Sequence, residues 1–285
     1  MEFPKSIDIP LDIWVDGIMD WVLSTFGGFF DMLGTGILYF LMYTEKFFLW
    51  LPWPILVLGV GILAWRVMGS WLAGLGMAGM LFFVGALGLW ELGMMTLALV
   101  VASVIVSLAI GIPLGIAMAS SDPFQAIIKP ILDGMQTMPS FVYLIPALML
   151  FGLGKVPALF ATIIYAVPPV IRLTNVGIRE VSANVIEAAH AFGSSYWQIL
   201  FKVQLPLARP TILVGINQTT MMALAMVVIA SMIGAKGLGL EVLLAINRIE
   251  VGRGFEAGLC IVFMAIIIDR ITFSMASHTK DNTDR

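Results

Sequence analysis

Charged side chains and cysteines are scarce in this chain. Only 12% of its 285 residues are Asp, Glu, Lys or Arg, whereas 60% are hydrophobic and the mean hydropathy is +1.01. A soluble domain has about a quarter charged residues and roughly 45–50% apolar ones, so this composition excludes a water-soluble domain and predicts that the solvent is lipid. The single cysteine, Cys260, excludes an internal disulfide. Its place in an apolar run predicts a small buried hydrophobic residue.

The sequence also shows no excess of basic residues, no signal-peptide pattern in residues 1–10 and no cluster of metal-binding or catalytic residue types. The formal net charge of −3 excludes a nucleic-acid binder that works through an overall basic surface. Residues 1–10 contain no basic region followed by an apolar one, so we expect no cleaved signal peptide. His190 and His278 are isolated from other metal-ligating residues, and we find no nucleophile–base pair. We therefore expect neither a metal site nor a catalytic site in this chain.

An energy source of its own is missing as well. The phosphate-cradling pattern G-x-x-x-x-G-K-[ST] does not occur, and the nearest stretch, residues 234–239, has the wrong order. An ion-coupled carrier buries acids or bases near the membrane midplane, but the third to sixth apolar runs contain none before Arg172. Asp269 and Arg270 come late in the last run, where we expect a structural role. The sequence thus predicts that a partner supplies the driving force.

Long apolar runs are what the chain has in abundance, because about 20 residues of helix cross a bilayer. They predict an all-α polytopic membrane protein with about seven transmembrane helices. The runs are residues 47–65, 71–90, 92–119, 138–153, 156–171, 211–233 and 257–276. The fourth and fifth are short and contain prolines, which predicts that they are buried among neighbouring helices. Small residues four apart, at Gly74 and Ala78 and at Gly111 and Gly115, predict close helix packing.

The organisation around these runs divides the chain into four parts. Residues 1–46 are expected to be an N-terminal interfacial segment, because Asp12, Asp16 and Asp20 share one face of an amphipathic helix over 11–26. An extra half-span over 27–43 remains open. Residues 47–90 then form two peripheral transmembrane helices, 91–276 the core, and 277–285 a tail.

The placement of Lys and Arg predicts the orientation. The polar insert 172–210 is net positive and therefore cytoplasmic. Parity through seven spans puts the tail inside and the N-terminus outside, although an extra half-span would move the N-terminus. The segment that begins at Asp122-Pro123 continues as a helix with one apolar stripe. We expect this helix to lie along the cytoplasmic interface.

The insert itself has readable helix signals. Ser182 is a possible cap for a helix over 183–192, and Gly193 ends it in the left-handed conformation. Ser195 with Gln198 predicts a capping box for a second helix, which Pro206 should stop. The first helix is either a docking surface for another protein or an interfacial loop packed on its own chain. We set a DNA-binding helix-turn-helix aside, because the second helix offers Lys202 as its single basic residue.

At this point the residues carry a family resemblance. Glu187-Ala188-Ala189, Gly193 and, further on, Val203-Gln204-Leu205-Pro206 resemble the "EAA…G…I-x-LP" signature of ABC importer permeases, with Val203 where isoleucine is usual. The stretches 131–154, 201–239 and 266–272 are similar to permeases for glycine betaine and related osmoprotectants. The resemblance covers nearly the whole chain and is strongest over 91–276.

This resemblance implies a type I ABC importer permease core in a bacterial inner membrane, with a cytoplasmic coupling helix seated in a groove of a separate ATPase subunit. It further implies a second copy of the permease, two ATPase subunits that bind ATP and Mg, and an extracytoplasmic substrate-binding protein, with no cofactor in this chain. The residues expected to couple to the ATPase are Glu187, Ala188, Ala189, Gly193, Leu205 and Pro206.

The substrate path is harder to read from the sequence. Aromatic faces attract quaternary ammonium groups, and polar side chains at similar depth could line the same path. The candidates are Phe141, Tyr143, Phe151, Asn217, Gln218, Thr219 and Met222. Hydrogen bonding between helices is an equally good reason for each polar one. A self-sufficient ion-coupled carrier for quaternary amines is the alternative function, and the solute itself stays open among betaines and other methylated amines.

Overall fold

The protein is helical throughout the part that the structure describes. This computed structural model describes the backbone of residues 10–281 and the side chains of residues 10–275, and it contains no strand there. The expectations for residues 1–9, for His278 and for the last four residues of the tail lie outside the described residues. The helices are α1 (Leu11–Trp50), α2 (Trp53–Met68), α3 (Trp71–Ala86), α4 (Trp90–Ser120), α5 (Asp122–Thr137), η1 (Ser140–Tyr143), α6 (Leu144–Phe151), α7 (Lys155–Arg179), α8 (Ala183–Ala191), α9 (Tyr196–Ile199), η2 (Leu200–Gln204), α10 (Leu205–Ser231), α11 (Leu238–Arg248) and α12 (Val251–Asp281).

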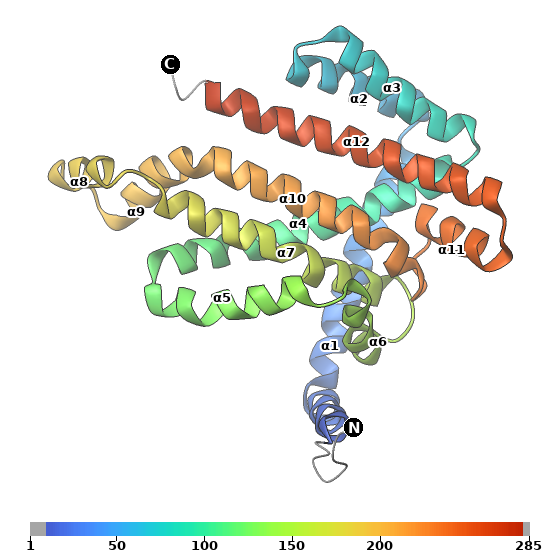
Figure 1. Cartoon of the computed structure of the whole chain (residues 1–285), viewed down its shortest axis with the longest axis horizontal. Coiled ribbons are helices and arrows are strands. Elements are labelled where there is room, and N and C mark those ends of the chain that lie inside the picture. Colours follow the sequence, from blue (N-terminus) through green and yellow to red (C-terminus); the bar gives the residue numbers. More distant parts are fainter. Residues whose placement is uncertain (1–9, 282–285) are drawn as a thin grey trace, which may run out of the picture.

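Four long helices, α4, α7, α10 and α12, run along a common direction and form the bundle (Figure 1). The short helix α8 lies at one end of the bundle and α11 lies at the other. Helices α4 and α7 approach closely because glycine faces α7: a Cβ on Gly115 would lie 2.7 Å from the carbonyl oxygen of Ile171. This confirms the close packing expected from Gly111 and Gly115.

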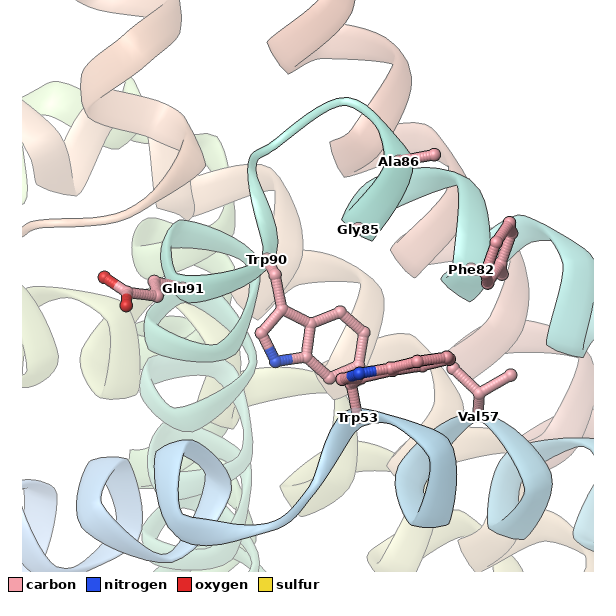
Figure 2. Close-up of a pocket in the computed structure, with 7 residues that line it drawn as sticks. All are labelled: Trp53, Val57, Phe82, Gly85, Ala86, Trp90 and Glu91. Atoms are coloured by element: carbon pink, nitrogen blue, oxygen red, sulfur yellow. The ribbon is translucent and has the colours of Figure 1, made fainter.

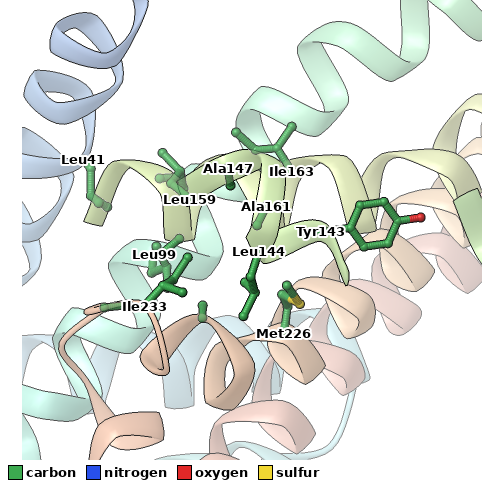
Figure 3. Packing of buried hydrophobic residues seen from close by; sticks show 14 residues of the cluster. Leu41, Leu99, Tyr143, Leu144, Ala147, Leu159, Ala161, Ile163, Met226 and Ile233 are labelled. Carbon is green, nitrogen blue, oxygen red and sulfur yellow. The ribbon is translucent and has the colours of Figure 1, made fainter. Parts of the chain in front are cut away.

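The largest core cluster fills the space between α4, α7, α10 and the η1–α6 segment. Figure 3 shows Leu99, Leu144, Leu159 and Met226 gathered between these elements. Leu159 and Met226 are completely buried. The expected fifth run is buried as predicted, since Pro168 and Pro169 are buried inside α7. The prediction is wrong for the fourth run, where Pro139 is exposed and Pro146 is half-exposed.

The N-terminal third differs from the expectation. A single helix, α1, runs from Leu11 to Trp50 through the whole interval where we expected a break at residues 46–47. The first apolar span at 47–65 is therefore wrong: the chain bends at Leu51-Pro52, and α2 starts at Trp53. Gly27 and Gly28 do not end α1, because glycine inside a helix costs only about 1 kcal/mol. In Figure 1, α1 runs crosswise to α7, α10 and α12.

The segment after α4 also differs. Helix α5 does not lie across the end of the bundle but runs alongside α7 in Figure 1, and its Leu132 packs into the same cluster as Val167, Val170 and Ile171 near the middle of α7. The expected helix along the interface is wrong for this reason. The chain then bends by 111° between α5 and the η1–α6 pair, so the two together make one broken span or re-entrant loop.

The number of spans is close to the expected seven. Among the described residues, five helices are long and apolar enough to cross a membrane, or six when the bent α5–α6 pair counts as one span. Helices α2 and α3 are apolar but only 16 residues long, about 24 Å at 1.5 Å per residue. They form a hairpin at the edge of the bundle, packed on α12 through a cluster that contains Leu56, Leu81 and Ile267.

Candidate coupling helix and translocation path

The expected coupling helix is formed and projects from the bundle. Helix α8 (Ala183–Ala191) stands at the end of α7, and all of its residues are exposed or half-exposed. Gly193 follows with a φ of +76°, and its N–H bonds to the carbonyl of His190. The next N–H, from Ser194, bonds to the carbonyl of Ala189. This left-handed ending matches the prediction made from the glycine.

The second helix of the insert begins as predicted and ends differently. Ser195 and Gln198 form the capping box, with the Ser195 N–H donating to Gln198 Oε1 at 2.8 Å. Pro206 does not stop this helix. Instead, the five residues Leu200–Gln204 form a π-helical turn that leads directly into α10, where Pro206 occupies the first turn. A first-turn proline needs no hydrogen-bond donor, so the helical path continues through it.

The six expected coupling residues therefore lie in two places. Glu187 and Ala188 are exposed and Ala189 is half-exposed, all on α8, with Gly193 at its end. Leu205 instead packs beside the cluster of Ile178, Leu200 and Ala208, where it supports the base of the insert. Pro206 is exposed at the same level. The insert thus presents a surface of small residues on α8, and the packing of Leu205 supports its base.

Sequence reasoning missed an aromatic residue on this surface. Phe192 directly precedes Gly193, and its side chain is 91% exposed, the highest exposure of any large apolar residue described. An exposed phenylalanine beside two alanines is typical of an interface anchor. The signal was available, because an aromatic residue in a polar insert has no core of its own to enter.

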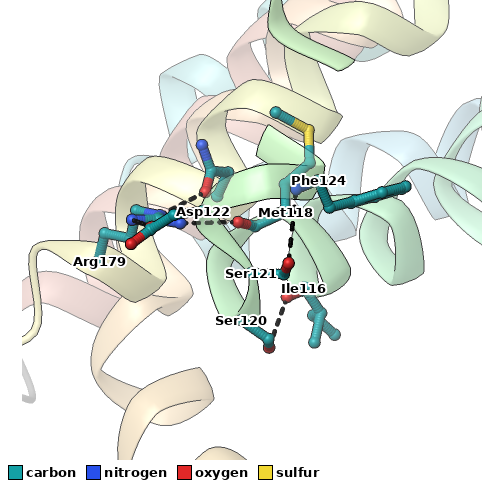
Figure 4. Close-up of polar contacts among 8 residues, drawn as sticks. Ile116, Met118, Ser120, Ser121, Asp122, Phe124 and Arg179 are labelled. Carbon is teal, nitrogen blue, oxygen red and sulfur yellow. Dashed lines mark hydrogen bonds and ion pairs between the residues drawn. The ribbon is translucent and has the colours of Figure 1, made fainter. Parts of the chain in front are cut away.

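Arg179 joins the stem of the coupling helix to two other helices (Figure 4). From the last turn of α7 it donates to the carbonyl of Met118 at 2.9 Å, near the end of α4, and pairs with Asp122 at 2.7 Å, at the start of α5. Its Nε also donates to Asn175 at 3.0 Å. One guanidinium therefore ties together the ends of α4, α5 and α7 next to α8.

The expected path residues do not converge on one site in this conformation. Phe141 and Gln218 are exposed, on η1 and α10 respectively. Tyr143 is buried, bonds to the carbonyl of Met135 and packs against Tyr165. Phe151 packs between α1 and α7, with ring contacts to Phe30 and Phe160.

The remaining three path candidates lie on α10 and face other helices. Asn217 donates to Asp269 on α12 at 3.0 Å and accepts from Thr272. This network favours the helix–helix role that the sequence left open for Asn217, and it gives Asp269 the structural partner we expected. Thr219 is fully buried and its hydroxyl has no hydrogen-bond partner within the described part of the chain, while Met222 packs beside Leu224. The path assignment itself stays a prediction.

An aromatic pocket lies away from both the coupling helix and the path candidates. Figure 2 shows Trp53, Phe82 and Trp90 around a cavity of about 470 Å³ at the ends of α2, α3 and α4, with the Glu91 carboxylate pointing away from the rings. Tryptophan is enriched where a helix meets the membrane–water interface. The position of these rings at helix ends fits that role.

Comparison with known proteins agrees with this architecture. The family described as "binding-protein-dependent transport system inner membrane component" matches residues 111–279. The glycine betaine/proline betaine transport system permease protein ProW of Escherichia coli is 46% identical over 99% of this chain and 79% of its own length. The glycine betaine transport system permease protein OpuAB of Bacillus subtilis is 47% identical over 93% of both chains.

A third relative and a solved structure complete the comparison. The glycine betaine/carnitine transport permease protein GbuB of Listeria monocytogenes is 47% identical over 97% of this chain and 99% of its own. A structure of the MetNI methionine ABC transporter in an inward-facing conformation matches the fold with a TM-score of 0.60 at 20% identity, over 67% of this chain and 95% of that chain. The matched residues run from the last third of α4 to near the end of α12 and include the coupling helix. This chain belongs to the family of binding-protein-dependent transport system inner membrane components.

Proposed function

We propose that this chain is the membrane-spanning subunit of an ATP-driven importer for betaine-type osmolytes. In this proposal α8 is the coupling helix that binds a partner ATPase and transmits its movement to the permease. The observation that carries the proposal is the geometry of the insert: a fully projecting helix of small residues, ended by Gly193 and flanked by Phe192. The names of the three relatives, all permeases for glycine betaine or its analogues, support the substrate class.

The proposed assembly contains two copies of this permease, two ATPase subunits and an extracytoplasmic binding protein. ATP and Mg bind to the ATPases, and this chain supplies no cofactor. The alanines of α8 let a partner approach the backbone closely, Phe192 enters a pocket of that partner, and the Glu187 carboxylate orients the contact. Interfaces are dominated by such aromatic anchors rather than by total area.

The proposed orientation places α8 in the cytoplasm and α11 outside. The net positive charge of the insert supports the cytoplasmic side. Helix α12 then returns the C-terminus to the cytoplasm. Glu45, near the C-terminal end of α1, pairs with Lys155 at the end of α7 opposite α8, which supports placing that end of α1 on the outer side.

The relatives give no support to the alternative of a self-sufficient carrier. Reconstitution separates the two functions: the permease alone, and the permease with its ATPase and binding protein, are assayed for glycine betaine uptake with and without ATP. We expect ATP-dependent uptake by the complete assembly and none by the permease alone. Uptake without ATP by the lone chain would refute the proposal.

The coupling surface is tested with two variants and one control. Glu187→Lys reverses the orienting charge, and Gly193→Pro abolishes the ending of α8 because proline cannot adopt a φ of +76°. We expect both proteins to insert normally and to lose co-purification of the ATPase. Glu180→Lys, an equally exposed charge reversal on the insert but outside α8, is the matched control. Normal ATPase binding by both α8 variants would show that α8 is not the dock.

A further inference from the structure

A charged pair, Asp133 of α5 and Arg172 of α7, lies on the exposed surface between these two helices. Arg172 Nη2 of α7 donates to Asp133 Oδ1 of α5 at 2.5 Å. Nearer the α8 end, Arg179 of α7 pairs with Asp122 of α5 at 2.7 Å. The two pairs fix α5 antiparallel to α7, and they place Arg172 about 10 Å from the end of α7, since each helical residue rises 1.5 Å.

The depth of this pair follows from its neighbours. Leu132, next to Asp133, is 2% exposed and belongs to the cluster that contains Val167 and Ile171. Residue 167 is the midpoint of α7, which runs from Lys155 to Arg179. Helix α7 is long and apolar enough to cross a membrane, and the pair lies between its centre and the end that carries α8.

Its side chains are nonetheless open to the outside of the chain. The side chain of Arg172 is 34% exposed and that of Asp133 is 51% exposed. Lys129 and Gln136, one turn before and one turn after Asp133, are exposed on the same face of α5. Ionised side chains at this depth are too costly to face lipid, and they face a water-filled cavity or the interior of an assembly. The strip formed by Lys129, Asp133 and Gln136 on α5 therefore faces water or an assembly partner and not lipid.

The chemistry of the pair matches the chemistry of a betaine. A betaine carries one carboxylate and one quaternary ammonium a few bonds apart, and Arg172 and Asp133 carry the opposite charges at hydrogen-bonding distance. The guanidinium has an unused donor, because Arg172 Nε has no hydrogen-bond partner within the described residues. This atom is buried, so the side chain must turn before a solute carboxylate can reach it. Arginine binds carboxylates through two parallel N–H donors when both are free.

We propose that Asp133 and Arg172 are a substrate-contacting pair of the translocation path and select for zwitterions. In the absence of substrate the two side chains neutralise each other. A betaine passing along α5 exchanges partners with them: its carboxylate takes the Arg172 guanidinium, and its ammonium lies beside the Asp133 carboxylate. A simple methylated cation has nothing to offer Arg172, so it cannot open the pair without leaving that charge unpaired. This inference rests on the proposed importer function.

Direct binding tests the substrate role. The permease–ATPase complex, purified without the binding protein, is assayed for equilibrium binding of radiolabelled glycine betaine, with tetramethylammonium as the competitor. We expect Arg172→Gln and Asp133→Asn each to weaken betaine binding about tenfold or more, as loss of a charge-assisted hydrogen bond does. Arg172→Lys, which keeps the charge and loses the paired donors, should lose less. Tetramethylammonium should compete poorly with betaine in the parent complex.

Two outcomes overturn the proposal. One is betaine binding that Arg172→Gln and Asp133→Asn both leave unchanged. The other is an absence of betaine binding in the parent complex. Either result is distinguishable from failure of the importer function, because ATP-driven uptake by the parent assembly is measured separately. A purely structural pair would reduce assembly or turnover in all these variants alike, without dependence on the charge of the solute.

Cysteine labelling keeps the test independent of variants that fail to assemble. The chain has one native cysteine, Cys260, which is buried and can be replaced by alanine. In that background we expect Asp133→Cys to react with a charged, membrane-impermeant thiosulfonate. Glycine betaine should slow the reaction when its concentration is raised enough to offset the weaker binding expected without the Asp133 carboxylate. The neighbouring Leu132→Cys, at a position 2% exposed, is the unreactive control. An unreactive residue 133, or a rate that betaine does not change, would contradict the assignment.

Discussion

Replacing either partner of the ion pair between α1 and α7 should lower the stability of the protein, but by different amounts. Lys155 Nζ donates to Glu45 Oε2 at 2.5 Å, and the two side chains are 28% and 11% exposed respectively. Removing one partner of a buried pair costs about 3–5 kcal/mol, mostly because the other charge is left without compensation. The exposures decide which removal costs more.

Lys155→Met strands the more buried charge. The Glu45 carboxylate has a short stem and little access to water, so we expect a loss near the lower limit, about 3 kcal/mol, which corresponds to a fall in melting temperature of roughly 6–12 °C. Glu45→Met instead leaves a lysine whose long stem can reach water, and we expect about 1 kcal/mol. The double variant removes both charges and should return to within about 1 kcal/mol of the parent.

The measurement is a thermal unfolding series of the purified protein followed by tryptophan fluorescence. Lys46→Met is the matched control, since Lys46 is the exposed neighbour of Glu45 on α1, and it should shift the transition little. Equal losses in the two single variants, or a double variant as unstable as their sum, would refute the assignment of the cost to a stranded carboxylate.

Four further variants follow from the same contacts. Gly115→Ala should lower stability by about 1–3 kcal/mol, because its Cβ would lie 2.7 Å from the Ile171 carbonyl oxygen; thermal unfolding measures this, with Gly79→Ala, where nothing lies within 4 Å, as the control. Ser195→Ala removes the capping box and should cost about 1 kcal/mol, seen as faster amide exchange at the start of the second insert helix. Asn217→Leu leaves the Asp269 carboxylate without its amide donor and should cost about 1–3 kcal/mol in the same unfolding assay. Phe192→Ala should weaken ATPase binding at least about tenfold without changing the melting temperature, and unchanged co-purification would remove Phe192 from the interface.

The insert could be predicted from the sequence because its signals are local. A glycine that ends a helix and a Ser–Gln capping box each act within one turn, and both are found where expected at Gly193 and at Ser195. The all-helical architecture was equally predictable, because the apolar composition indicates a lipid environment. A backbone in lipid must satisfy its hydrogen bonds within helices or closed barrels.

The course of α5 could not be predicted in the same way. A hydropathy scale scores each residue separately. The charges of Lys129 and Asp133 therefore made the segment look polar and favoured a position along the membrane interface. In the structure the Asp133 charge is compensated by Arg172, which lies 39 positions further along the chain. A compensated charge can lie at a depth where a lone one cannot.

Long-range pairing also explains why α1 was divided wrongly. Gly27 and Gly28 weaken the helix locally, but its C-terminal half is held by contacts with elements more than 100 residues away. Gly34 accommodates the ring of Phe151, Leu41 enters the main core cluster, and Glu45 reaches Lys155. Tertiary contacts of this kind override a weak local preference.

The Arg179 contacts connect the two proposed sites mechanically. Helix α8 follows directly on α7, so a force on α8 acts first on the end of α7 that carries Arg179. The guanidinium holds the carbonyl of Met118 and the carboxylate of Asp122, and a displaced Arg179 therefore moves the start of α5 with it. Helix α5 is continuous over its 16 residues, with Pro130 inside it, a length of about 24 Å, and it carries Asp133 on its exposed face. Movement at the coupling helix thus reaches both members of the charged pair: Arg172 directly along α7, and Asp133 through the Arg179 guanidinium and α5.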